Sequence, residues 1–86
     1  MYAILVYDVG EDRIERLRKF LKKYMFWIQN SVFEGEISEY ELSVITENIK
    51  NIIEEKDSVV IYIFRTDKEF KKLTLGNAKG KTGMII

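Results

Sequence analysis

Two stretches of this 86-residue chain are apolar at every position, and they constrain its fold more than any other feature. The first runs from Tyr2 to Tyr7 and the second from Val59 to Phe64. Both are short and rich in β-branched and aromatic residues. Each is therefore predicted to be a strand buried on both faces.

Two segments with helical periodicity lie between these strands. Apolar residues recur at helical spacing from residue 14 to 24 and predict an amphipathic helix of about 12–15 residues with a basic outer face. Asp12 and Glu15 are spaced for a capping box at its start. A second capping box, Ser38 with Glu41, marks the start of a second helix, which a charged turn closes near Asp57.

The remaining segments favour strands. Residues 27–37 fit either one bent strand or a tight hairpin around residues 33–35. Residues 70–75 alternate loosely between polar and apolar side chains and predict a fifth short strand. A flexible basic loop with Lys79 and Lys81 follows.

This order of elements predicts an α+β fold, a ferredoxin-like βαββαβ sandwich with an additional C-terminal strand. Both helices are expected on one face of an antiparallel sheet. We expect a single domain over residues 1–86, with a core of residues 1–65. The other sheet face lacks a cover, and a long apolar edge strand is an aggregation hazard. We therefore expect a homodimer packed sheet to sheet, in which residues 66–86 cover an edge, most readily the partner's.

Composition excludes several classes of function. Histidine and cysteine are absent, which removes Ser-His-Asp triads, thiolate nucleophiles and most zinc sites. No apolar stretch reaches the ~18 residues of a membrane span, and no secretory signal is visible, so no membrane partner is expected. The net charge is zero, but six basic residues lie between Arg13 and Lys23, and an acidic segment follows between Glu34 and Asp57.

Asp8 is the candidate site residue, because it ends an apolar strand and its carboxylate emerges at the rim of the sheet. A loop-forming aspartate is the plainer interpretation of such a position. One carboxylate makes a poor divalent-metal site, since Mg²⁺ prefers six oxygens in octahedral geometry. Two copies of Asp8 across a dimer axis could hold Mg²⁺ or Mn²⁺ with water and a nucleic-acid phosphate, and could cleave a phosphodiester without histidine.

Other candidates are weaker. The Ser31 hydroxyl could act as a nucleophile, although a strand hydroxyl usually only forms a hydrogen bond. Tyr7, Trp27 and Phe33 could stack on bases, although aromatic residues in strands are mostly core.

Three segments then indicate a family: Tyr-Ala-Ile-Leu-Val-Tyr-Asp-Val at the start, Trp-Ile-Gln-Asn-Ser-Val-Phe-Glu-Gly-Glu-Ile-Ser in the middle, and Asp-Ser-Val-Val-Ile-Tyr near residue 60. In order and spacing they resemble the Cas-two family of small CRISPR-associated proteins. The resemblance implies a ferredoxin-like homodimer whose C-terminal strand packs on the partner, in the cytoplasm of a prokaryote.

The resemblance also implies roles for single residues. Asp8 falls on the catalytic aspartate, a ligand of Mg²⁺ or Mn²⁺ in a nuclease acting on RNA or double-stranded DNA. Tyr7, Ser31 and Phe33 are expected near it. Nucleic-acid contacts fall on basic residues of the first helix, namely Arg13, Arg16 and Arg18. Trp27 stands where many relatives carry a basic residue.

Three functions stay open at this point. The resemblance implies spacer acquisition, in which the dimer holds a duplex and bridges an integrase partner protein, with or without metal-dependent cleavage. One alternative is a purely architectural, non-catalytic DNA-binding adaptor. A remote alternative is a ferredoxin-like regulatory module that binds a small ligand.

Overall fold

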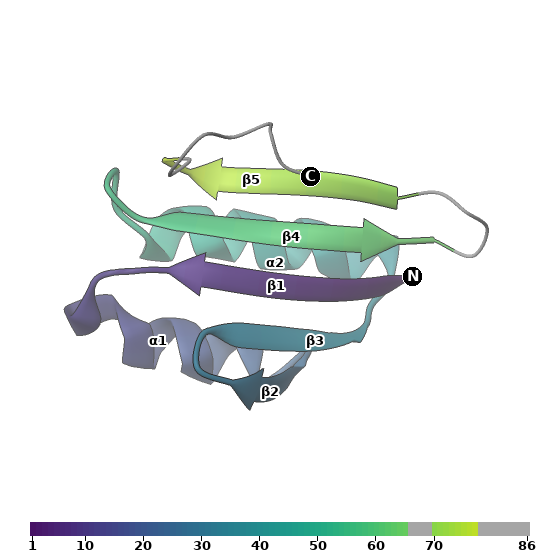
Figure 1. Cartoon of the computed structure of the whole chain (residues 1–86), viewed down its shortest axis with the longest axis horizontal. Coiled ribbons are helices and arrows are strands. Elements are labelled where there is room, and N and C mark those ends of the chain that lie inside the picture. The colour runs from purple at the N-terminus through teal and green to yellow at the C-terminus, as the bar shows by residue number, and fades with distance from the viewer. Residues whose placement is uncertain (66–69, 78–86) are drawn as a thin grey trace.

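The computed structural model describes residues 1–65 and 70–77. The elements are, in chain order, β1 (Tyr2–Asp8), α1 (Glu11–Leu21), β2 (Phe26–Gln29), β3 (Val32–Glu36), α2 (Glu39–Ile52), β4 (Ser58–Phe64) and β5 (Phe70–Gly76). The strands form one antiparallel sheet in the order β2-β3-β1-β4-β5, and both helices lie behind it in Figure 1. The predicted α+β, ferredoxin-like fold is confirmed.

The central strand β1 has two different faces. Ala3, Leu5 and Tyr7 point toward the helices and are buried, whereas Ile4 and Val6 on the opposite face are only half-buried. The prediction that both apolar strands are buried on two faces is therefore wrong for a single chain. The physical reason is that the two helices cover one side of the sheet only (Figure 1). We call the other side the open face.

The core lies between the sheet and the helices. Leu17 and Leu21 of α1, Ile45 and Ile49 of α2, and Phe33 of β3 are fully buried there. Helical spacing puts each pair from one helix on one side, so each helix presents a single apolar stripe to the sheet.

The two helices begin differently. At α2 the predicted capping box is present, since the Glu41 N–H donates to Ser38 Oγ at 3.0 Å and the Ser38 N–H donates to Glu41 Oε1 at 2.9 Å. At α1 the predicted box of Asp12 and Glu15 is wrong, because Gly10 occupies the cap position and no side chain caps the helix.

Residues 26–36 form a hairpin, which settles the choice between a hairpin and one bent strand. The turn lies at Asn30 and Ser31, not around residues 33–35, and Asn30 has a positive φ of 43°. The register passes from Trp27 opposite Phe33 to Gln29 opposite Val32, which is a bulge.

The fifth strand is confirmed over residues 70–76. It pairs along its whole length with β4 of the same chain, so that β4 is an inner strand and the edge it would have formed is covered. The predicted basic loop with Lys79 and Lys81 lies outside the described residues. Within the described ranges, no helix is both long enough and apolar enough to cross a membrane.

Candidate nucleic-acid interface and metal-ligand position

Asp8 is the last residue of β1 and lies opposite Ser58 of β4. Side chains alternate along a strand, so Asp8 shares the open face with Ile4 and Val6. It is exposed, at the edge of the half-buried apolar surface that the helices leave uncovered. The structure thus places the predicted carboxylate at a sheet rim and on the face expected to meet a second copy.

The donor set around Asp8 decides whether one chain could hold a metal. Across residues 1–65 and 70–77, no three acidic side chains gather closely enough to bind an ion. Mg²⁺ requires several hard oxygen ligands. Asp8 therefore fits a metal site only as a shared ligand, with further oxygens from a second copy, water or a bound phosphate.

The loop that follows Asp8 is anchored by a buried ion pair. Arg13 Nε donates to Asp57 Oδ2 at 2.7 Å and Arg13 Nη2 donates to Asp57 Oδ1 at 2.9 Å. The same carboxylate accepts the N–H of Gly10 at 3.0 Å and that of Glu54 at 2.8 Å. The β1–α1 loop is thereby tied to the loop between α2 and β4.

These hydrogen bonds shift both ionisation equilibria. The Arg13 guanidinium, followed by the two backbone N–H donors, holds the pKa of Asp57 well below its usual range despite burial. In return the hydrogen bond to Asp57 raises the pKa of Arg13. Arg13 is also 3.2 Å from Glu54 and is only 9% exposed, so its guanidinium is not presented to a phosphate on the surface. We therefore leave Arg13 out of the nucleic-acid surface.

The residues expected near Asp8 serve the fold, and the side chains of Tyr7 and Phe33 lie on the helix-covered side of the sheet, away from the face that carries Asp8. The Tyr7 N–H donates to the Ser31 carbonyl at 3.1 Å, which joins β1 to the hairpin turn. Phe33 is fully buried, with its ring centroid 6.3 Å from that of Tyr7. Neither ring is presented to a base, so the interpretation of Tyr7 and Phe33 as core residues is confirmed.

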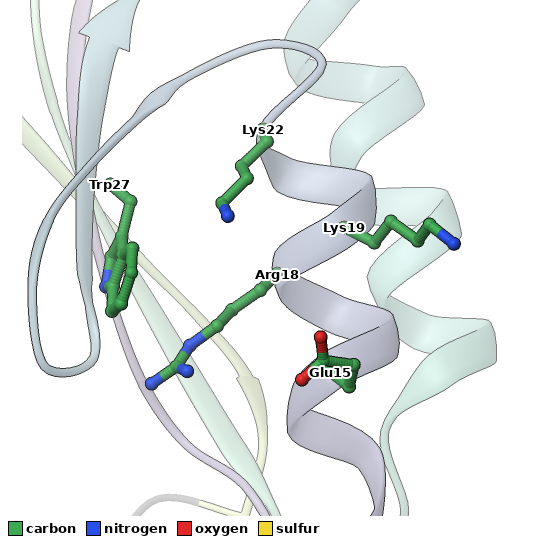
Figure 2. Close-up of a pocket in the computed structure, with 5 residues that line it drawn as sticks. All are labelled: Glu15, Arg18, Lys19, Lys22 and Trp27. Atoms are coloured by element: carbon green, nitrogen blue, oxygen red, sulfur yellow. The ribbon is translucent and has the colours of Figure 1, made fainter.

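Basic side chains gather instead on the outer side of α1. The structure contains a cleft of about 540 Å³ between α1 and β2, shown in Figure 2. Its lining residues are Glu15, Arg18, Lys19, Lys22 and Trp27. Arg16 is also exposed on α1 but does not line the cleft. Of the three predicted contact residues, Arg16 is thus exposed and Arg18 is half-buried in the wall of the cleft.

Sequence reasoning missed the part that Lys22 and Trp27 play in this cleft. Arg18 and Lys22 are four positions apart, and that spacing places them on one side of a helix. The pairing of this side with β2 depends on the hairpin, which the sequence left open.

Comparison with known proteins gives consistent matches. A family model described as CRISPR associated protein Cas2 matches residues 1–72. A Pyrococcus furiosus protein named CRISPR-associated endoribonuclease Cas2 is 49% identical over 87 residues, covering all of both chains. A protein of the same name from Dictyoglomus turgidum is 46% identical, again over the whole of both chains.

Solved structures agree. A crystal structure described as cas2 is 46% identical, with a TM-score of 0.75, and the match covers 100% of this chain and 98% of the other. Streptococcus pyogenes Cas2 at pH 6.5 is 30% identical, with a TM-score of 0.70 over 78% of this chain and 89% of its own.

Proposed function

Because the chain belongs to the CRISPR associated protein Cas2 family, we propose that it is a nucleic-acid-binding homodimer that serves spacer acquisition and cleaves phosphodiester bonds with a divalent metal. Relatives at 46–49% identity carry the name endoribonuclease, which supports RNA as one substrate. The single observation that carries the proposal is the position of Asp8 on the open face, where a second copy would bring a second carboxylate.

The open face supports the dimer. Val60 and Tyr62 of β4 are half-buried on it, and Phe64 and Phe70 are 40% and 54% exposed. The Phe64 and Phe70 rings are in contact, with centroids 5.3 Å apart, so the apolar surface continues from β4 onto β5. Contiguous exposed apolar surface of this kind is typical of association sites. Because β5 pairs with β4 of its own chain, the expected packing of this strand on the partner's sheet is not part of the proposal, and the proposed dimer joins the open faces of two five-stranded sheets.

Asp8 from both copies would hold Mg²⁺ or Mn²⁺ at the dimer axis, together with water. Such an ion supplies charge stabilisation at the scissile phosphate and lowers the pKa of water. The protein's own contribution is position: the Arg13–Asp57 pair fixes the loop after Asp8, and β3 and β4 hold β1 from both sides.

Nucleic acid would be bound by cations on the outer side of α1 and at its C-cap, of which Arg18 is half-buried and the others are exposed. Arg16, Arg18, Lys19 and Lys22 lie on its outer surface, away from the core stripe of Leu17 and Leu21. Contacts of this kind are made to phosphates, so binding should weaken steeply with salt and show little sequence preference.

An architectural role is the second candidate, and the donor set of a single chain favours it. Within the described ranges, one chain supplies no three-acid metal site. In this role the dimer would hold a duplex and bridge the integrase partner without cleaving. The acidic side chains on the exposed side of α2, Glu39 and Glu47 among them, are a candidate surface for that partner.

The test compares the wild-type protein with Asp8→Asn. We expect the wild type to cleave single-stranded RNA or duplex DNA in the presence of Mg²⁺ or Mn²⁺. Asp8→Asn should lose this cleavage but bind nucleic acid as tightly as the wild type. Cleavage that persists in a highly purified Asp8→Asn protein contradicts the metal site. Salt-sensitive binding without cleavage in either protein would establish the architectural role instead.

A further inference from the structure

The cleft between α1 and β2 holds the chain's only tryptophan against two cations. Trp27 is 44% exposed, the Arg18 Cζ atom is 4.5 Å from its ring centroid, and Lys22 Nζ is 5.3 Å from it (Figure 2). Cations within about 6 Å of an indole face are attracted by the ring quadrupole. Trp27 therefore brings a cation from the last turn of α1 and the cation at the C-cap of this helix to one point.

The ring and the guanidinium are both held in place by neutral groups. Trp27 Nε1 donates to the Asn30 carbonyl at 2.9 Å. Arg18 Nη2 donates to the same oxygen at 3.3 Å, and Arg18 Nε donates to the Tyr7 hydroxyl at 2.7 Å. These acceptors orient Arg18 without cancelling its charge.

The positive charge of the cleft is not neutralised. Over the part of the chain that the structure describes, none of Arg18, Lys19 and Lys22 forms an ion pair, although Glu15 lines the same cleft. The volume of about 540 Å³ is within the range of roughly 300–1,000 Å³ that ligand sites occupy. The cleft thus combines a fixed guanidinium, a second cation and space for an anion.

We propose that Arg18 and Lys22 bind one backbone phosphate of a nucleic-acid strand and that Trp27 is the positioning residue that brings these two cations together. Because the two cations lie over the indole, the strand would bind through ion pairs between these cations and its phosphate, and not by stacking of a base on the ring. A guanidinium suits this task, because its planar donors match phosphate oxygens. The inference rests on the proposed nucleic-acid binding but is independent of Asp8 and of cleavage.

The experiment measures binding of a single-stranded oligodeoxynucleotide and of an abasic strand of equal length to the full-length protein at low salt. Lys22→Gln should weaken binding about tenfold, as expected for loss of a charged hydrogen bond. Trp27→Leu should weaken binding roughly fivefold. Trp27→Phe keeps an aromatic face and should therefore retain most of the wild-type affinity. Lys50→Gln on α2 is the charge-matched control and should change nothing.

The decisive measurement is the energetic coupling between Trp27 and Lys22 in a double-mutant cycle. In a Trp27→Leu background, Lys22→Gln should cost clearly less than tenfold, because the lysine is no longer held in position. The abasic strand should bind the wild type as tightly as the normal strand. Each variant should lower the affinity for an RNA strand by the same factor as the affinity for DNA. Fluorescence of the single tryptophan should change on binding. Equal thermal midpoints of the variants show that each is folded.

Several results overturn the inference. Additive losses in the double variant remove the positioning role. Weaker binding of the abasic strand than of the normal strand would show that Trp27 stacks on a base. If the variants change RNA affinity and DNA affinity by different factors, the cleft recognises the sugar and not the phosphate. If these occur while the wild type still binds nucleic acid, the proposed function stands. If the wild type binds no strand even at low salt, both the inference and the proposed nucleic-acid binding fail.

Discussion

Arg13 and Asp57, 44 positions apart in the chain, form a two-pronged ion pair in which Nε and Nη2 donate to the two carboxylate oxygens at 2.7 and 2.9 Å. Asp57 is 2% exposed, and its oxygens also accept two backbone N–H groups. The pair joins the loop after Asp8 to the loop before β4. It is therefore the structural support of the candidate site.

Asp57→Asn should destabilise the protein. The amide cannot replace the charged two-pronged contact, and it leaves Arg13 buried beside a neutral group. Asp12 and Glu54 still contact Arg13 Nη1, so we expect a fall of the thermal midpoint of about 10 °C, at the lower end for a broken buried pair. Glu55→Gln, an exposed neighbour, is the matched control in differential scanning calorimetry. Equal midpoints for the two variants would show that the pair contributes nothing.

The same carboxylate should make stability depend on acid pH. The pKa of Asp57 is lowered in the folded state by Arg13 and by backbone N–H groups. Its contribution is therefore fully present above the unfolded-state pKa of about 3.9 and is lost as the pH falls from there toward the folded-state pKa. Urea unfolding at a series of pH values should show this loss in the wild type. Asp57→Asn should show a smaller decline, and parallel curves for the two proteins would refute the linkage.

Gly76→Ala should weaken the attachment of β5. Gly76 has a positive φ of 83°, and a Cβ there would lie 2.3 Å from the Asp57 carbonyl oxygen, which also accepts the Asn77 N–H at 2.8 Å. We expect the free energy of unfolding to fall by about 1–3 kcal/mol, because both backbone strain and a clash are introduced. Gly35→Ala, whose nearest neighbour would be 3.4 Å away, should cost less. Chemical denaturation compares the two, and the reverse order would be inconsistent with this geometry.

Ile4→Lys should separate the proposed dimer. Ile4 is half-buried at the middle of the open face, opposite Tyr62, so a lysine there costs one chain little but places a charge inside a sheet-to-sheet interface. Sedimentation should give a dimer for the wild type and a monomer for Ile4→Lys. Asn48→Lys on the exposed side of α2 is the control and should remain dimeric. A dimeric Ile4→Lys protein would place the interface elsewhere.

Local signals in the sequence predicted the fold well. The Ser38 capping box, the apolar runs and the helical stripes depend on residues a few positions apart, and all three determine element type directly. The error at Asp12 has a non-local cause, because Arg13 is held by a carboxylate 44 positions away and Asp12 is drawn to Arg13 Nη1 at 3.1 Å. A signal for the burial of Arg13 was present, since it precedes Leu17 by four positions and so lies on the apolar side of α1.

The candidate site was predictable only in part. The position of Asp8 at the sheet rim is predictable because this residue ends an apolar strand. Its place on the open face is predictable because side chains alternate between the two faces along a strand. The contact between Trp27 and the α1 cations was not predictable, because it depends on a turn at Asn30 and a bulge after Trp27 that set which way β2 faces. Turn position and register are decided by tertiary packing as much as by local composition.

The central claim is that two copies meet through their open faces with both Asp8 side chains at the axis, and a single engineered cysteine tests it most directly. The chain contains no cysteine, so Asp8→Cys provides one reactive group per copy. A short thiol-to-thiol cross-linker should convert Asp8→Cys into a covalent dimer, whereas Glu47→Cys on the helical side should stay uncross-linked. Covalent dimers of Glu47→Cys with none of Asp8→Cys would contradict the shared metal site and the dimer on which it depends.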